Sequence, residues 1–357
     1  MKRPSFLLLL VFPILTWCQC FDGDCVSGKG SFKFKNGVYV GEFFAGQPDG
    51  QGTFSTNKGY SYKGGWTGGL KSGKGIEKLK KTITYDGEFR DNIKNGSGTG
   101  WLSETKHMFN VVYSGEWSQG SICGKGEMKY SREVKYNRER VVEFNTLTGD
   151  FINGVYQGRL TSNYSDELNW EPFGLEMTDF QKYEKLTKKE RSKRKNPATI
   201  EGDIVVSCEC LANTLVFDSH AILRKEMSAW STEDIPTKTK QIVLNSMQRE
   251  FDIIQWYAKV LEIKLNKAKL VCERASLDFV WTELGGVKKQ CNQARKSYLS
   301  ETAWNPNKGR PKNTRIQQKW DNQISKKLET QQKKGGKIKS NLRKKLTKKD
   351  EAVCLEA

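Results

Sequence analysis

The sequence of 357 residues contains only two histidines, His107 and His220. Histidine is the commonest metal ligand and titrates near neutral pH, so few residues are available for metal binding or acid–base catalysis. Cys208-Glu209-Cys210 is spaced more closely than the cysteine pairs of zinc sites, which favours a structural or disulfide role. A nucleophilic cysteine paired with His220 would lack any flanking signature. We therefore expect no enzymatic activity, no cofactor and no metal.

Long apolar runs are also scarce. Phe6–Trp17 forms a 12-residue apolar run behind Lys2 and Arg3, shorter than the roughly 20 residues that a membrane-spanning helix needs. This pattern predicts a signal peptide over residues 1–20, cleaved after Cys18 or Cys20. A buried first strand or a retained anchor is the alternative, and the bulky Trp17 argues against a lipidated cysteine. We expect a secreted, periplasmic or cell-envelope protein.

Nine cysteines suit an oxidising destination. Cleavage after Cys18 would leave eight of them, an even number, whereas cleavage after Cys20 would leave seven and one spare thiol. Cys20 and Cys25 are close enough in sequence for a local loop disulfide. The sequence does not define the other pairings.

Acidic residues are rare near the C-terminus. Between Lys288 and Lys349 there are 20 Lys and Arg but only three acidic residues, so much of the net charge of +19 lies there. We expect the tail, residues 331–357, to be too basic to fold alone, and its removal to change folding little. Its candidate binding residues are Lys333, Lys334, Lys337, Lys339, Arg343, Lys344, Lys345, Lys348 and Lys349.

The expected partner of the chain is a protein, or an anionic lipid or polymer bound by this tail. In an exported protein such ligands are more accessible than nucleic acid, and the sequence has no recognised nucleic-acid-reading module. A solvated charge run without a partner is the commonest explanation of such a segment.

Glycine is abundant, with 33 residues, and it recurs in a fixed pattern. The half-copy Gly23–Gly37 comes first, and five copies follow: YVGEFFAGQPDGQG from Tyr39, YKGGWTGGLKSGKG from Tyr62, YDGEFRDNIKNGSG from Tyr85, YSGEWSQGSICGKG from Tyr113 and the decayed LTGDFINGVYQGRL from Leu147. The starts lie 23, 23, 28 and 34 residues apart. Such self-similarity indicates stacked units that share one structure.

Each copy has the pattern of a β-hairpin. Alternation places Tyr39, Gly41 and Phe43 on one face of a strand, where a neighbouring ring can lie over the glycine backbone. Gly46 stands where the chain must reverse, and Asn92 replaces it in the third copy, as expected for a position with positive φ. A single hairpin is marginally stable in water, so the copies should stack into one sheet.

These residues resemble the MORN repeat family over roughly Gly23 to Leu160. The matching aromatic and glycine positions, which are also the candidate structural or binding residues of the repeat face, are Tyr39, Gly41, Phe43, Tyr62, Gly64, Trp66, Tyr85, Gly87, Phe89, Tyr113, Gly115 and Trp117. The resemblance implies an elongated antiparallel sheet over residues 21–165 that serves as a scaffold or binding surface and has no catalytic residues. With a signal peptide, the chain resembles the exported bacterial members.

The other half is expected to be helical. Residues 166–200 are read as a linker with a short charged helix, marked by Phe180 and running through Thr187–Lys195. Within the helical region, residues 201–330, apolar residues recur every three or four positions from Ile204 to Trp230. A heptad seam then runs over residues 244–279 and should end at Gly285-Gly286.

A second apolar stripe on the heptad helix favours the centre of a helical bundle, with dimerisation through residues 244–279 as the alternative. The fold class is therefore α+β: stacked hairpins followed by a helical bundle or coiled-coil-like region. The function expected is that of a non-catalytic exported scaffold or binding protein. The alternatives are attachment to an anionic membrane or polymer through the tail, and an enzyme whose helical half has an unrecognised catalytic part.

Overall fold

The computed structural model of the protein describes residues 19–136, 139–161, 165–172, 174–182, 198–230, 240–302, 304–305, 310–311 and 313–346. The expected signal peptide up to residue 18, the charged stretch Thr187–Lys195, and Lys348 and Lys349 lie outside this part. Among the described helices, none is long and apolar enough to cross a membrane. The chain divides into two compact units, one up to Leu102 plus Val112–Ser121, the other Ser103–Val111 plus Ile122–Glu356.

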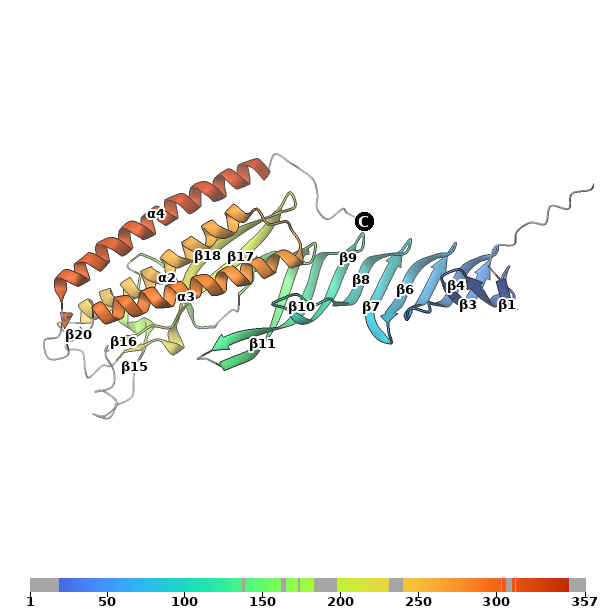
Figure 1. Cartoon of the computed structure of the whole chain (residues 1–357), viewed down its shortest axis with the longest axis horizontal. Coiled ribbons are helices and arrows are strands. Elements are labelled where there is room, and N and C mark those ends of the chain that lie inside the picture. Colours follow the sequence, from blue (N-terminus) through green and yellow to red (C-terminus); the bar gives the residue numbers. More distant parts are fainter. Residues whose placement is uncertain are drawn as a thin grey trace, which may run out of the picture. The chain divides into compact units, whose positions relative to one another are not determined.

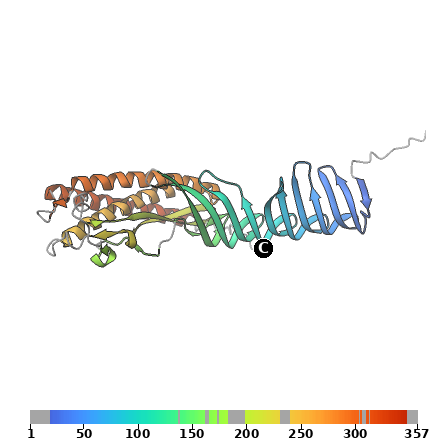
Figure 2. The same ribbon diagram turned by 90° about the horizontal axis from the view of Figure 1, so that it is seen from below.

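The first unit is a series of antiparallel hairpins, seen side by side in chain order in Figures 1 and 2. Its strands are β1 (Gln19–Gly23), β2 (Lys29–Phe34), β3 (Gly37–Phe44), β4 (Gln47–Ser55), β5 (Tyr60–Thr67), β6 (Leu70–Leu79), β7 (Thr82–Arg90) and β8 (Ile93–Leu102). The repeat glycines face one another in the register, as in the pairs Gly41 with Gly52 and Gly64 with Gly75. The predicted hairpins are therefore present, one for each copy.

Two-residue turns close the hairpins of the repeats. Both central residues have positive φ, 50° and 77° at Ala45-Gly46 and 50° and 71° at Asp91-Asn92, as type I′ turns require. The N–H of Gly46 donates to the carbonyl of Val26 (2.9 Å), and the N–H of Asn92 donates to that of Lys71 (3.1 Å). Each turn is thus hydrogen-bonded to the preceding repeat. The positive φ expected at Asn92, which stands where other copies have Gly, is confirmed.

The sheet continues in chain order through β9 (Phe109–Ser118), β10 (Ser121–Tyr136), β11 (Glu139–Ile152) and β12 (Val155–Tyr156), which gives twelve strands among the described residues. The decayed copy keeps the turn hydrogen bond, because the N–H of Gly154 donates to the carbonyl of Ile122 at 3.1 Å. Its short β12 ends the sheet.

The second unit places helices on a β-hairpin (Figure 1). Its helices are α2 (Lys240–Ala268), α3 (Leu277–Glu301) and α4 (Thr314–Leu346), with short 3₁₀ turns at Met177–Asp179, Lys225–Met227 and Arg274–Ser276. Its strands are β17 (Gly202–Leu211) and β18 (Thr214–Arg224), flanked by β13 (Gly158–Arg159) and β14 (Glu167–Asn169), with the short β15 (Gln181–Lys182), β16 (Ala198–Thr199), β19 (Ala229–Trp230), β20 (Trp304–Asn305) and β21 (Arg310–Pro311). Helix α2 packs against β18, α3 and α4. The α+β class is confirmed.

The prediction of helix from Ile204 to Trp230 is wrong. Up to Arg224 this stretch is the β17–β18 hairpin, reversed at Ala212-Asn213, where φ is 43° and 59°, and a 3₁₀ turn and β19 follow. Ile204, Val205 and Val206 are all buried, so both faces of the strand are apolar. A strand buried on both faces loses its period of two, and periodicity alone then cannot separate it from a helix.

The expected single helix over residues 244–279 is also interrupted. Helix α2 ends at Ala268, Lys269 has a φ of 49°, and Cys272 forms a disulfide with Cys210. Helix α3 then runs through Gly285-Gly286, the pair expected to stop it. A Cβ at either glycine would meet no atom within 4 Å, so both lie on the open side of a helix that is held by packing on its other side.

The described part of the tail, residues 331–346, is helical. It was expected to be too basic to fold alone, and in the structure it is held against the second unit. Residues up to Leu346 belong to α4, whose Ile324 and Leu328 are buried. The Nζ of Lys339 lies 2.7 Å from a carboxylate oxygen of Asp218 in β18, and Arg343 pairs with Glu209 in β17. Apolar packing and ion pairs to the hairpin thus hold a helix that its charge would otherwise disfavour.

Candidate functional site

The repeat tyrosines form a buried aromatic ladder in the first unit. Tyr39, Tyr62, Tyr85 and Tyr113 are fully buried, and each contacts ring neighbours edge to face. The centroid separations, all between 5.0 and 5.8 Å, join Tyr39 to Phe43 and Trp66, Tyr62 to Trp66 and Phe89, Tyr85 to Phe89 and Trp117, and Tyr113 to Trp117. This geometry is favourable for aromatic pairs. Tyr39, Tyr62 and Tyr85 each join their own repeat to the next, whereas Tyr113 contacts Trp117 of its own repeat.

The repeat glycines make room for these rings. A Cβ at Gly52 would lie 2.2 Å from the Tyr39 hydroxyl, and one at Gly75 would lie 2.4 Å from the Tyr62 ring. The hydroxyl of Tyr39 donates to the carbonyl of Glu42 at 3.0 Å, and Tyr62 repeats this bond to Gly65. Burial raises the pKa of Tyr39 and of Tyr62 to about 12, so both remain neutral donors. The expected ring over a glycine backbone is present.

This packing defines what the predicted repeat face does. Its tyrosines, with Phe43, Phe89 and Trp117, are buried in the core, and Trp66 is half-buried. Gly41, Gly64 and Gly87 sit opposite other glycines, and Gly115 lies in β9. Side chains without solvent exposure cannot contact a partner, so the four tyrosines, Phe43, Phe89 and Trp117 contribute packing rather than direct binding.

Two lysines lie over ring faces of the same ladder. The Nζ of Lys71 is 5.1 Å from the Phe89 centroid, and the Nζ of Lys94 is 4.7 Å from that of Tyr85. Both lysines pair with Glu77, at 2.6 and 3.5 Å. Burial alone would raise the pKa of Glu77, but its bonds to Lys71 and Tyr60 outweigh this and lower it. These lysines thus make their contacts within the repeats, to Glu77 and to the aromatic rings.

The family comparison agrees with this architecture. The family model of the MORN repeat matches residues 39–59, 62–80, 85–99 and 113–132. The four full copies are MORN repeats. MORN repeats are generally protein- or membrane-binding modules without catalytic activity. A search of curated proteins finds no matching protein.

The basic residues of the tail divide into docked and exposed groups. Lys339 and Arg343 face the β17–β18 hairpin in ion pairs. Exposed on α4 are Lys333, Lys334, Lys337, Lys344 and Lys345. The C-terminal half of α4 therefore binds the unit through one side and leaves cations on the other.

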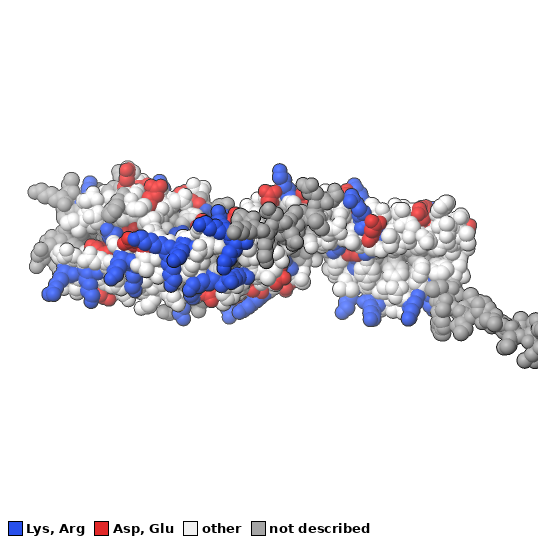
Figure 3. Space-filling model, turned by 90° about the horizontal axis from the view of Figure 1, so that it is seen from above, with Lys and Arg blue, Asp and Glu red and all other residues white. Residues whose placement is uncertain are grey.

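The exposed side extends beyond the predicted tail. Six exposed cations, called here the basic row, follow one another four or seven residues apart: Arg315, Lys319, Lys326, Lys333, Lys337 and Lys344. This spacing keeps them on one face of a helix, opposite the buried Ile324 and Leu328. Figure 3 shows Lys and Arg gathered along this side of the second unit. The first three were missed because they precede the tail, although the spacing could have revealed them.

A polar seam on α2 was also missed. Gln248, Asp252, Gln255, Glu262 and Asn266 are buried on this helix. Glu262 accepts from the N–H of Ser219 at 3.0 Å, and Asn266 accepts from the N–H of Phe217 and donates to its carbonyl, both at 2.9 Å. Glu262 and Asn266, together with Gln255, which accepts from the N–H of Ala221 at 2.7 Å, satisfy the edge of β18 where no strand of the described residues pairs with it. Their own three- and four-residue spacing is the signal for this seam.

The candidate catalytic and metal-binding groups are dispersed. His107 contacts Thr282 at 3.0 Å, and burial lowers its pKa and that of His220. In the Cys-x-Cys pair, Cys210 is disulfide-bonded, whereas burial raises the pKa of the Cys208 thiol to about 12. Among the described residues, no three His, Cys, Asp or Glu side chains gather to hold a metal ion.

Proposed function

We propose that this chain is a non-catalytic exported scaffold or binding protein whose MORN repeats form a rigid platform and whose helix α4 binds an extended polyanion. The observation that supports this is the basic row. From Arg315 to Lys344 it covers about 44 Å at 1.5 Å per residue. Glu329 is the only acidic residue on the same face and is already paired with Lys333 at 2.5 Å.

The chemistry of the face favours a polymer over a membrane. Membrane-surface helices combine cations with apolar side chains that enter the lipid. In α4 the buried apolar residues Ile324 and Leu328 point into the unit. On the exposed face of α4, the residues between the cations of the row are polar, as Asn322, Thr330 and Ser340 illustrate. A row of charges without an apolar border suits a linear chain of anionic groups.

Binding of the full chain to a sulfated polysaccharide tests this proposal. Lys319→Gln, Lys326→Gln and Lys337→Gln together should weaken binding tenfold or more, at roughly 1 kcal/mol for each lysine. They should also flatten the dependence of log Kd on log salt, by about 0.7 to 0.9 for each contact in nucleic-acid polyanions. The matched control, Lys58→Gln, Lys63→Gln and Lys78→Gln, removes the same charge from exposed sites on the repeats.

Two results would contradict the proposal. Equal weakening by the two triple variants would mean that net charge, and not the row, drives binding. Binding to vesicles rich in anionic lipid, without binding to the polysaccharide, would identify a membrane surface as the ligand instead.

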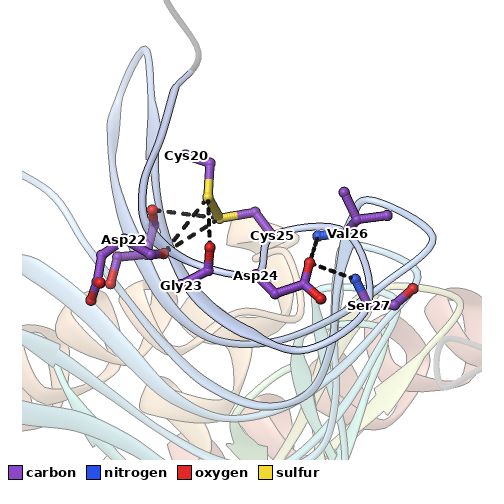
Figure 4. The surroundings of a disulfide bond; sticks show 8 residues. Cys20, Asp22, Gly23, Asp24, Cys25, Val26 and Ser27 are labelled. Carbon is purple, nitrogen blue, oxygen red and sulfur yellow. Dashed lines mark hydrogen bonds between the residues drawn. A yellow bond between two sulfur atoms is a disulfide. The ribbon is translucent and has the colours of Figure 1, made fainter.

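Export belongs to the same proposal, with cleavage after Cys18. Cys20 forms a disulfide with Cys25 (Figure 4), with the two Cα atoms 6.0 Å apart, and β1 begins at Gln19. In the same loop, Asp24 accepts from the N–H of Val26 at 2.8 Å and of Ser27 at 3.1 Å. Cleavage after Cys20 would remove one half of the disulfide. N-terminal sequencing of the mature protein should begin at Gln19, and a start at Phe21 would contradict this.

A further inference from the structure

Helix α4 contains an internal repeat. The segment KWDNQISKKL (Lys319–Leu328) returns eighteen residues later as KIKSNLRKKL (Lys337–Leu346). Both segments have lysine at the same three positions and apolar residues at the same three positions. An α-helix has 3.6 residues per turn, so a shift of eighteen residues is five full turns. Each residue of the first segment and its counterpart in the second therefore point in the same direction.

Both segments belong to one continuous helix that is docked on the second unit. Ile324 of the first segment is buried, and its counterpart Leu342 is half-buried. In the second segment, Lys339 is paired with Asp218 of β18. The side opposite this packing is thus held in a fixed orientation along both segments.

The basic row repeats with the same period. Its six cations form two triads, the first of which is Arg315, Lys319 and Lys326 and the second Lys333, Lys337 and Lys344. Each cation of the second triad follows its counterpart by eighteen residues, a shift of about 27 Å along the helix axis without rotation. A strict spacing of seven residues would instead drift by about 20° around the helix in each heptad. The same arrangement of charges is therefore present twice along one straight line.

The two triads are both accessible. All six cations are exposed. Lys333 is paired with Glu329, but these side chains are 76% and 65% exposed. Exposed ion pairs contribute little stability, so Lys333 can turn from Glu329 to a ligand.

We propose that the two triads are equivalent subsites, occupied together by one linear polyanion at least about 44 Å long. Resting on the proposed function of the basic row, this assignment names the ligand class as a regular linear polymer. Such a polymer presents the same anionic groups again after a shift along its axis, whereas a compact acidic protein does not. Binding at one triad makes binding of the same polymer at the other intramolecular, which raises the affinity above that of either triad.

Calorimetric titration of the full oxidised chain with sulfated oligosaccharides of graded length tests the two subsites. An oligosaccharide of about 17 Å, the span of one triad, should bind with two molecules per chain. One longer than about 44 Å should bind with one molecule per chain and at least tenfold more tightly, because multivalent binding can add a factor of about 10²–10⁴.

Two triple variants serve as matched controls for each other, because each removes three charges from one triad. They are Arg315→Gln, Lys319→Gln and Lys326→Gln in the first triad, and Lys333→Gln, Lys337→Gln and Lys344→Gln in the second. Each should bind only one short oligosaccharide per chain, and both should bind the long one more weakly by the same factor of ten or more. Circular dichroism of both variants reports whether the helices are kept. The length series on the wild-type chain stands even if a variant does not fold.

The outcomes separate this assignment from the function on which it rests. One short oligosaccharide per wild-type chain, or weakening confined to one of the two folded variants, would overturn the paired subsites and leave polyanion binding by α4 intact. A wild-type chain that binds no sulfated oligosaccharide of any length would overturn the proposed function and the paired subsites together.

Discussion

At the scale of residues, glycine serves the repeats by leaving space. A Cβ at Gly75 would lie 2.4 Å from the ring of the fully buried Tyr62. Gly75→Ala should therefore lower the free energy of unfolding by about 1–3 kcal/mol, as overpacking of a core does. Lys63→Ala, at an exposed site on the facing strand, should stay within about 0.5 kcal/mol. Equal losses in urea unfolding would show that the ring does not occupy this space.

At other glycines, the backbone conformation alone decides whether alanine stabilises or destabilises the fold. Neither Gly69, with a φ of 82°, nor the helical Gly285 has an atom within 4 Å of its Cβ position. Gly69→Ala should destabilise by about 1–2 kcal/mol, because left-handed backbone disfavours a side chain. Gly285→Ala should stabilise by about 0.5–1 kcal/mol, since alanine is the better helix former. Thermal unfolding of the two variants should shift in opposite directions, and shifts of the same sign would contradict the turn or the helix.

The ion pairs of Asp218 make the docking of α4 sensitive to acid. Burial alone would raise the pKa of Asp218, but Lys339 and Lys259 outweigh it and lower the pKa to about 2. A lowered carboxyl pKa means that the stabilisation is complete above the ordinary value of 3.8 and is lost as the pH falls through about 2. Asp218→Asn should thus lower the unfolding midpoint at pH 7. The difference from the wild type should shrink between pH 4 and 2, and a constant difference would exclude this linkage.

At the scale of elements, α2 holds β18 through side chains in place of a neighbouring strand. Replacing Asn266 by Leu leaves the buried N–H and C=O of Phe217 without their partners, and each unsatisfied group costs about 1–3 kcal/mol. Asn245→Leu changes an exposed position on the same helix and should change little. Loss of protection of the Phe217 amide in hydrogen exchange would accompany the destabilisation. Unchanged exchange in Asn266→Leu would contradict the role of this side chain.

The elements differ in how far the sequence predicts them. The repeats were predictable because each copy carries its own register, turn residues and aromatic–glycine pattern, down to Asn92 in place of Gly. The β17–β18 hairpin was not, because Ile204, Val205 and Val206 are all apolar and mask the strand period. Helix α3 continues through Gly285-Gly286 because its opposite side is packed against the unit. A glycine pair in the sequence predicts a helix end and contains no information about that packing.

The candidate site was also predicted only in part from the sequence. The aromatic residues were correctly placed on one face, but their burial follows from contacts between copies that a single pattern does not reveal. The tail was judged by composition, which correctly gave its charge and missed its fold. Acidic partners such as Asp218 and Glu209 are more than 100 residues away in sequence, so only the tertiary structure brings them to Lys339 and Arg343.

At the scale of the whole molecule, the proposed binding depends on how the cations behind the net charge of +19 are held in place. A free basic tail would be a flexible polycation that binds any anionic surface. A docked helix holds the same cations in a fixed row and commits Lys339 to the unit itself. The proposed binding to an extended polyanion requires the second arrangement.

Hydrogen exchange of the full chain over residues 331–346 tests this claim most directly. The docked helix should protect these amides well beyond the rates of a free peptide of the same sequence, and Asp218→Asn should reduce that protection. The amides of the repeat strand β7, which Asp218 does not contact, should be unaffected and serve as the control. Exchange of residues 331–346 at free-peptide rates in the wild-type chain would contradict the docked helix and, with it, the basic row as a fixed binding surface.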